Sequence, residues 1–266
     1  MKRLLVANKQ KTGKSRYFHE RMEIMLKAQI ENLLELGWHP QNIILLTNFY
    51  FEFMGIKSEV IKLNDFCLSG SKMWALKFLF DNNRVDGIIH ASDLDCWQNS
   101  WFDCPDFSTD VGACEYSNPK FNGGSIFWNP GAKDIVDEVV RVLTETKAKS
   151  EEPTLNKIFR SDKYKNRVSV LNSTYNVGCS GFFERLTRSE RPIKVCHFQP
   201  QNTVAWEIHG LNRDGIGEIA VTIRLERLLR KYYPDLAIEL KDETVPQQKR
   251  DQREAKRLKK NKGKKD

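Results

Sequence analysis

The chain has 266 residues, of which 40% are apolar and 29% are charged. This length suits one large α/β domain with extensions, and the apolar content excludes wholesale disorder because a sizeable core can be buried. No apolar run is long enough to span a membrane, and residues 1–7 turn polar too early for a signal peptide, so we expect a cytoplasmic protein.

The positive charge is concentrated at the end of the chain. Residues 247–266 hold ten Lys/Arg against three Asp/Glu and so carry +7 of the formal net charge of +8. We therefore expect a basic, disordered tail at 241–266 behind a nearly neutral domain at 1–240. Six cysteines form no Cys-x-x-Cys pair, which favours scattered cytosolic thiols over a zinc site or a disulfide framework.

Apolar periodicity divides the domain into alternating strands and helices. Short apolar runs predict strands at 3–7, 42–48, 58–63, 87–92, 110–116, 121–130, 167–171 and 194–198. Helical spacing predicts helices at 16–36, 71–82, 134–146, from 151 onward, and 219–233. Polar or aromatic loops are expected at 8–15 and 97–109. The alternation predicts an α/β fold, a single domain built on a mostly parallel twisted sheet with helices on both faces.

Two carboxylates leave the end of the strand predicted at 87–92. Asp93 and Asp95 are two residues apart, so in an extended segment their side chains point the same way and can reach one hard cation. Ligands bind at the carboxyl edge of the strands in open α/β sheets, and Mg²⁺ or Mn²⁺ held by one or two carboxylates commonly carries substrate phosphates. The acid pair therefore predicts a metal–diphosphate site.

Other polar residues are expected at the same edge. Asn8 follows the first strand, and Thr47 and Asn48 end the second, which makes them candidate contacts to a nucleoside base and ribose. Lys72 begins a predicted helix and is a candidate partner for donor phosphates, although a solvated lysine is the ordinary alternative.

Four segments follow one another in a distinctive order. They are Asp93-Leu94-Asp95, the run 121–130 (FNGGSIFWNP), the acidic helix start 151–156 (EEPTLN), and His197 within residues 195–198 (VCHF). In this order they resemble GT-A fold glycosyltransferases, and the sequence as a whole is similar to bacteriophage-type and giant-virus-type members. The resemblance implies transfer of a sugar from a UDP- or GDP-sugar to a hydroxyl acceptor, with a glycan as the first candidate; a viral member would act in the host cytoplasm.

The resemblance also implies a metal site. Asp95 would ligate the ion directly, Asp93 would lie nearer the ribose or a metal-bound water, and His197 would supply a third ligand through a neutral ring nitrogen, which suits Mn²⁺ better than Mg²⁺. For His197 the open alternative is a buried histidine bonded to a backbone carbonyl.

The resemblance assigns the remaining roles. The segment Asn122-Gly123-Gly124 would let the backbone approach the donor sugar, or it forms a β-bulge. Glu151 or Glu152 would be the acceptor-side acid, the general base in an inverting enzyme, or both acids simply favour a helix start. Inversion and retention both stay open. Aromatic residues at 97, 101 and 102 form either an acceptor platform or core packing.

Two other functions compete with this interpretation. Residues 8–15 (NKQKTGKS) approximate a phosphate-binding P-loop, but Asn8 replaces its first glycine. If Asp93 served as the Walker B acid, the protein would be an NTPase. The basic tail is a candidate weak binder of nucleic acid or an anionic membrane surface, or else a solubilising extension.

Overall fold

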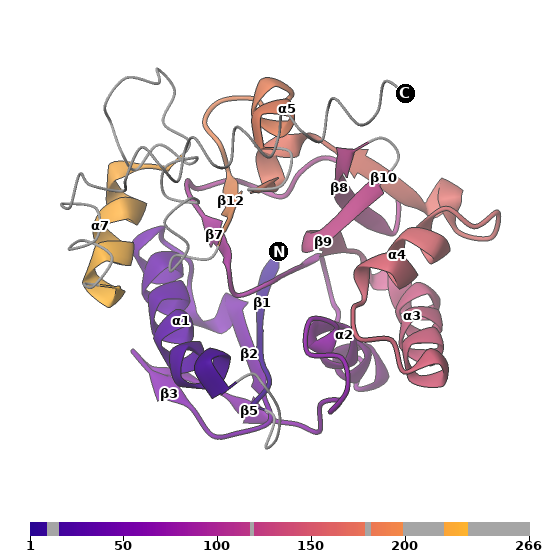
Figure 1. The fold of residues 1–266 in the computed structure, drawn as a ribbon, viewed down its shortest axis with the longest axis horizontal. Helices are drawn as coiled ribbons and strands as arrows, with labels where there is room; N and C mark the ends of the chain where they lie inside the picture. The colour runs from indigo at the N-terminus through magenta and orange to yellow at the C-terminus, as the bar shows by residue number, and fades with distance from the viewer. Residues whose placement is uncertain (10–15, 118–119, 179–181, 199–220, 234–266) are drawn as a thin grey trace, which may run out of the picture.

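The computed structural model describes residues 1–9, 16–117, 120–178, 182–198 and 221–233 (Figure 1). Its centre is a seven-stranded sheet in the order β10-β8-β9-β6-β1-β2-β5. In that order the strands are β10 (Val168–Leu171), β8 (Val111–Ser117), β9 (Lys120–Trp128), β6 (Ile89–Ser92), β1 (Lys2–Ala7), β2 (Ile43–Thr47) and β5 (Glu59–Val60). Within this sheet β9 alone runs antiparallel to its neighbours, so the mostly parallel sheet is confirmed.

Helices cover both faces of the sheet, as predicted (Figure 1). On one face lie α1 (Arg16–Glu35) and α7 (Ile223–Tyr232), and on the other lie α2 (Ser71–Asp81), α3 (Lys133–Thr146) and α4 (Glu152–Phe159). Alternate strand residues explain the two layers, because successive side chains of a strand point to opposite faces. Leu5 packs in the cluster under α1, whereas Leu4 packs in the cluster under α2 and α3.

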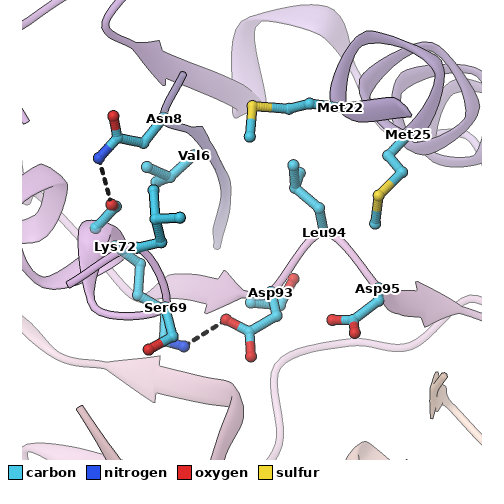
Figure 2. A pocket seen from close by; sticks show the side chains of 12 residues that line it. Val6, Asn8, Met22, Met25, Ser69, Lys72, Asp93, Leu94 and Asp95 are labelled. Atoms are coloured by element: carbon cyan, nitrogen blue, oxygen red, sulfur yellow. Dashed lines mark hydrogen bonds and ion pairs between the residues drawn. The ribbon is translucent and has the colours of Figure 1, made fainter. Parts of the chain in front are cut away.

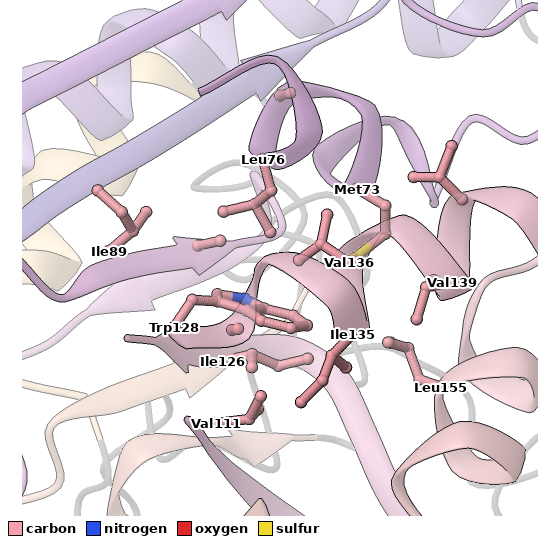
Figure 3. Close-up of a cluster of buried hydrophobic side chains, with 14 of the residues drawn as sticks. Met73, Leu76, Ile89, Val111, Ile126, Trp128, Ile135, Val136, Val139 and Leu155 are labelled. Carbon is pink, nitrogen blue, oxygen red and sulfur yellow. The ribbon is translucent and has the colours of Figure 1, made fainter. Parts of the chain in front are cut away.

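The larger core lies between the sheet and α2, α3 and α4. Met73 and Leu76 from α2 meet Ile135 and Val136 from α3 over the indole of Trp128 (Figure 3). All five of these side chains are at most 1% exposed. Truncating one of them to Ala would cost roughly 2–5 kcal/mol of folding free energy, because such a site rarely collapses fully.

A smaller sheet brings a distant segment to the end of β6. Its strands are β11 (Val177–Gly178), β12 (Val195–His197) and β7 (Cys96–Gln98), and β12 pairs antiparallel with β7. The loop predicted from residue 97 is wrong for Trp97 and Gln98, which belong to β7. A three-residue strand shows no period of its own, and its partner lies about a hundred residues further along the chain.

Several short elements were not predicted. They are the hairpin β3 (Glu52–Phe53) and β4 (Ile56–Lys57), the helix α5 (Phe182–Thr187), and the 3₁₀ turns Pro40–Asn42, Pro130–Ala132, Lys165–Arg167 and Ser173–Tyr175. The strand expected at 58–63 is only β5, and the helix expected from 219 begins at Ile223 in the described part of the chain.

The predicted tail at 241–266 and most of the P-loop-like segment lie outside the described residues. In the described ranges we find no helix with the length and apolarity needed to cross a membrane. The cysteines within those ranges, Cys67, Cys96, Cys104, Cys114 and Cys196, form no disulfide with one another.

Candidate active site

A cavity of about 400 Å³ opens at the carboxyl edge of β1 and β6. That volume falls in the range of small-molecule sites. Its walls come from the end of β1, from α1, from the segment that starts α2, and from the turn after β6 (Figure 2). The lining residues are Val6, Asn8, Met22, Met25, Leu68, Ser69, Ser71, Lys72, Ser92, Asp93, Leu94 and Asp95.

The acid pair lies on a tight turn at this edge. The Asp93 amide donates to the carbonyl of Gly124 on β9 at 2.9 Å, and the Cys96 amide donates to the carbonyl of Asp93 at 3.0 Å. Leu94 points away toward Met22 and Met25, which leaves both carboxylates on the other side of the turn (Figure 2). The two acids therefore share one side, as predicted, although a turn and not an extended strand puts them there.

Lys72 joins two of the predicted acids. Its ammonium lies 2.5 Å from Asp93 Oδ1 and 2.7 Å from Glu151 Oε1. The side chains of Lys72 and Glu151 are each 4% exposed, whereas that of Asp93 is 29% exposed. The alternative of a solvated lysine is thus wrong. Gly123 makes room for this arrangement, because a Cβ there would lie 3.0 Å from Glu151 Oε1.

Burial and charge pull the titration of this cluster in opposite directions. Burial, reinforced by the charges of Glu151 and Asp95, raises the pKa of Asp93 to about 6 against the opposing effect of Lys72. Burial also opposes ionisation of Glu151 and Lys72, yet Lys72 lowers the pKa of Glu151, and Asp93 together with Glu151 raises the pKa of Lys72. One ammonium faces two carboxylates, and the buried Oε2 of Glu151 has no hydrogen-bond partner among the described residues. The cluster therefore keeps an unused acceptor.

Asp95 faces a second partner, His197. Its Oδ1 lies 3.4 Å from His197 Nε2, across the β7–β12 pair. Gly124 lies directly against the imidazole, and a Cβ at that position would overlap the ring. Although burial opposes protonation of the ring, the neighbouring Cys96 and Asp95 raise the pKa of His197 well above its ordinary value.

A chain of amide hydrogen bonds orients this histidine. Asn122 donates to Glu152 Oε2 at 3.2 Å, and Asn176 donates to Asn122 Oδ1 at 2.7 Å. Asn176 Oδ1 then lies 3.2 Å from His197 Nδ1. Because the amide oxygen can only accept, Nδ1 carries the proton and Nε2 faces Asp95. Asn176 belongs to no sequence motif and acts only through this packing, so no sequence signal marks it.

The remaining predicted residues lie at the rim with their side chains engaged. Asn8 lines the cavity and donates to the carbonyl of Asn64 at 2.7 Å and to Ser71 Oγ at 2.8 Å. The amide of Asn48 exchanges two hydrogen bonds with the backbone of Lys9, and the Thr47 hydroxyl donates to the carbonyl of Phe49. Thr47 and Asn48 thus shape the rim without lining the cavity.

The aromatic residues expected as an acceptor platform divide between core and surface. Trp97 and Phe102 are 0% and 4% exposed, so both belong to the core. Trp101 is 47% exposed and packs against Trp38 with 5.6 Å between ring centroids. Of the three, Trp101 alone presents a ring face to solvent.

The donor atoms around Asp95 suit a divalent cation. One oxygen of Asp95, the sulfur of Cys96 and one ring nitrogen of His197 all lie within 4.8 Å of one another. Asp93 lies at the same turn, so the predicted set of Asp93, Asp95 and His197 is gathered at one place. Tautomer control by Asn176 is the usual support of a metal-binding histidine.

Comparison with solved structures places this architecture. The chain superposes on the galactosyltransferase LgtC, crystallised with donor and acceptor sugar analogues, with a TM-score of 0.53 and 14% identity over 94% of this chain and 99% of LgtC. The glycosyltransferase GlyE of Streptococcus pneumoniae superposes with a TM-score of 0.51 and 12% identity, over 88% of this chain and 64% of GlyE. The bifunctional glycosyltransferase WbbM superposes with a TM-score of 0.51 and 15% identity, over 87% of this chain and 51% of WbbM. The chain has the GT-A fold.

No protein-family model and no curated protein sequence matches the chain. At these identities the likeness concerns the GT-A fold alone, and the function must be argued from the site. In this fold the cavity, the acid turn and the carboxyl ends of β1 and β6 coincide.

Proposed function

We propose that the protein is a metal-dependent glycosyltransferase that moves a sugar from a UDP- or GDP-sugar to a hydroxyl acceptor, with a glycan as the first candidate. One observation carries the proposal. In a GT-A fold, a cavity of about 400 Å³ is bordered by an acid turn whose two carboxylates have separate partners, Lys72 for Asp93 and His197 for Asp95.

This division of partners suits a nucleotide-sugar donor. Asp95 and His197, with Asp93 beside them, would hold Mn²⁺ or Mg²⁺, which supplies Lewis-acid stabilisation of the departing diphosphate. Lys72, fixed by two buried ion pairs, holds Asp93 in place beside the cavity. Asn8 lies on the cavity wall where a nucleoside would enter at the end of β1.

The two glutamates take different parts in this proposal. Glu151 is buried against Lys72 and is not among the residues that line the cavity, so its part is to fix Lys72, and through it Asp93, beside the donor site. Glu152 is half-buried and held by Asn122, so it is the better candidate for taking the proton of an acceptor hydroxyl. The two glycines after Asn122 then make room for Glu151 and His197, because a Cβ at either position would meet one of those side chains.

The P-loop-like alternative is not favoured. Asn8 points its amide into a network with Asn64 and Ser71, and Asp93 is committed to Lys72. A P-loop instead wraps backbone amides around phosphate. The nucleic-acid alternative depends on the tail, which lies outside the described residues.

The test is nucleotide release from a panel of UDP- and GDP-sugars, with and without Mn²⁺. The expected result is metal-dependent release from one donor class, reduced about 100-fold or more in Asp95→Asn, which removes charge at the proposed ligand. The matched control is Asp86→Asn, because Asp86 precedes the same strand and pairs with Lys2 at the surface. Hydrolysis of ATP or GTP without a sugar donor would instead support the NTPase, and equal release by Asp95→Asn would refute the site.

A further inference from the structure

A thiol lies beside the proposed cation ligands. Cys96 begins β7 directly after Asp95 and is paired with His197 in the β7–β12 register. Its side chain is fully buried, and its sulfur, one Asp95 oxygen and one His197 nitrogen lie within 4.8 Å of one another. Among the described residues, no other group of three or more His, Cys, Asp or Glu side chains lies close enough together to hold one ion.

The geometry matches a compact tetrahedral site. Bonds of about 2.0–2.3 Å to nitrogen, oxygen and sulfur place tetrahedral ligands roughly 3.4–3.8 Å apart. Side-chain shifts of about 1 Å or less are therefore sufficient to close the three donors on one ion. Three protein ligands would leave a fourth position for water or substrate, as in other sites with three protein ligands.

The ligand chemistry discriminates between cations. Carboxylate oxygen alone suits Mg²⁺ and Mn²⁺, whereas a thiolate selects borderline-soft ions such as Zn²⁺ and its spectroscopic substitute Co²⁺. Binding would form a sulfur–metal bond and release the thiol proton to solvent, which makes the sulfur an anionic ligand.

A buried positive charge adjoins the thiol. Arg3 is fully buried, and its hydrogen-bond partners among the described residues are neutral groups, namely His90, Ser92 Oγ at 2.6 Å and the carbonyl of Cys96 at 3.4 Å. Buried charges are ordinarily paired. An anionic sulfur at Cys96 would give the guanidinium a nearby counter-charge, because the guanidinium already reaches the backbone of the same residue.

We propose that Asp95, Cys96 and His197 form a mixed oxygen, sulfur and nitrogen site in which the Cys96 thiolate adds much more to the affinity for Zn²⁺-class cations than to the affinity for Mn²⁺ or Mg²⁺. The inference deepens the proposed function, because it concerns the ion class at the same turn. It gives Cys96 the role of the selecting ligand, while Asp95 and His197 serve any divalent ion.

The test is titration of the full chain with Co²⁺, followed by absorption. A thiolate ligand produces a near-ultraviolet sulfur-to-cobalt charge-transfer band in addition to visible cobalt bands. We expect this band in the wild type, its loss in Cys96→Ser, and retention in Cys114→Ser. Cys114 is a matched control because it is also buried, in the same core cluster, and donates to the carbonyl of Asn172 at 3.2 Å.

Two further measurements make the outcome decisive. Zn²⁺ affinity should fall at least about tenfold in Cys96→Ser while Mn²⁺ affinity changes about twofold or less. His197→Ala leaves every cysteine in place. In this variant the Co²⁺ affinity of the protein, measured from the growth of the charge-transfer band, should fall at least about tenfold. Visible cobalt bands without the charge-transfer band in the wild type, or an unchanged band in Cys96→Ser, would overturn the inference.

The two proposals fail separately. Mn²⁺-dependent nucleotide release by a wild type that shows no thiolate band would overturn the cation inference and leave the glycosyltransferase standing. A thiolate band that depends on Cys96, in a protein that releases nucleotide from no sugar donor, would overturn the glycosyltransferase proposal and leave the cation site standing.

Discussion

Replacing Lys72 with Met tests the buried ion-pair cluster most directly. Methionine keeps the unbranched stem and the helix propensity of lysine, so the change chiefly removes the ammonium. Asp93 and Glu151 would then face each other without a cation, at side-chain exposures of 29% and 4%. Breaking a buried pair by removing one partner costs about 3–5 kcal/mol. For a chain of this size we expect a fall in Tm of about 6–20 °C.

The matched control is Lys77→Met on the same helix. Lys77 also contacts two carboxylates, Asp81 at 3.0 Å and Asp137 at 2.6 Å, but its side chain is 37% exposed. Exposed pairs of this kind contribute about 0–1 kcal/mol, so the control should lose about 4 °C or less. Thermal unfolding followed by circular dichroism measures both variants under one condition.

The pH dependence separates charge from packing. Without Lys72 the pKa of both carboxyls rises in the folded state, and a raised carboxyl pKa destabilises the fold increasingly as pH rises above the unfolded value. The deficit of Lys72→Met should therefore be largest near pH 7.5 and shrink toward about pH 5, where protonation relieves the repulsion. A deficit equal to that of Lys77→Met, or one of the same size at both pH values, would refute the reasoning.

Three further outcomes concern His197. Gly124→Ala should displace the imidazole and lower Mn²⁺ affinity about tenfold or more by calorimetry, whereas Gly87→Ala, with nothing within 4 Å of its added Cβ, should leave it unchanged; equal effects would remove the role of Gly124. Asn176→Ala should lower Mn²⁺ affinity about 10–100-fold by freeing the ring tautomer, and an unchanged affinity would make Asn176 merely structural. Because the pKa of His197 is raised well above its ordinary value, a proton must leave before Nε2 can ligate; Mn²⁺ affinity should rise up to about tenfold per pH unit through neutrality, and a flat profile would argue against ligation.

Local pattern predicted the elements of the sheet and the place of the acid pair. Short continuous apolar runs and helical spacing depend on neighbours a few residues apart, so strands such as β1 and β6 and helices such as α3 appear in the sequence without knowledge of their partners. The edge position of Asp93 and Asp95 follows from the strand before them. Elements of two or three residues, such as β7 and β12, carry no such signal.

The partners within the site depend on the folded chain. Asn48 was a candidate nucleoside contact and Lys72 a candidate phosphate partner or a solvated lysine, yet Asn48 is engaged by the backbone of Lys9 and Lys72 is buried between two acids. Nothing near residue 176 in the sequence marks Asn176 as the support of His197.

The helices, the strands and the position of the acid pair at the sheet edge can thus be predicted from residues close in sequence, because secondary structure depends on local periodicity. The charge states, the ring tautomer and the ligand set come from contacts between segments up to a hundred residues apart. Only the packed core brings those segments together and removes the water that would otherwise screen them.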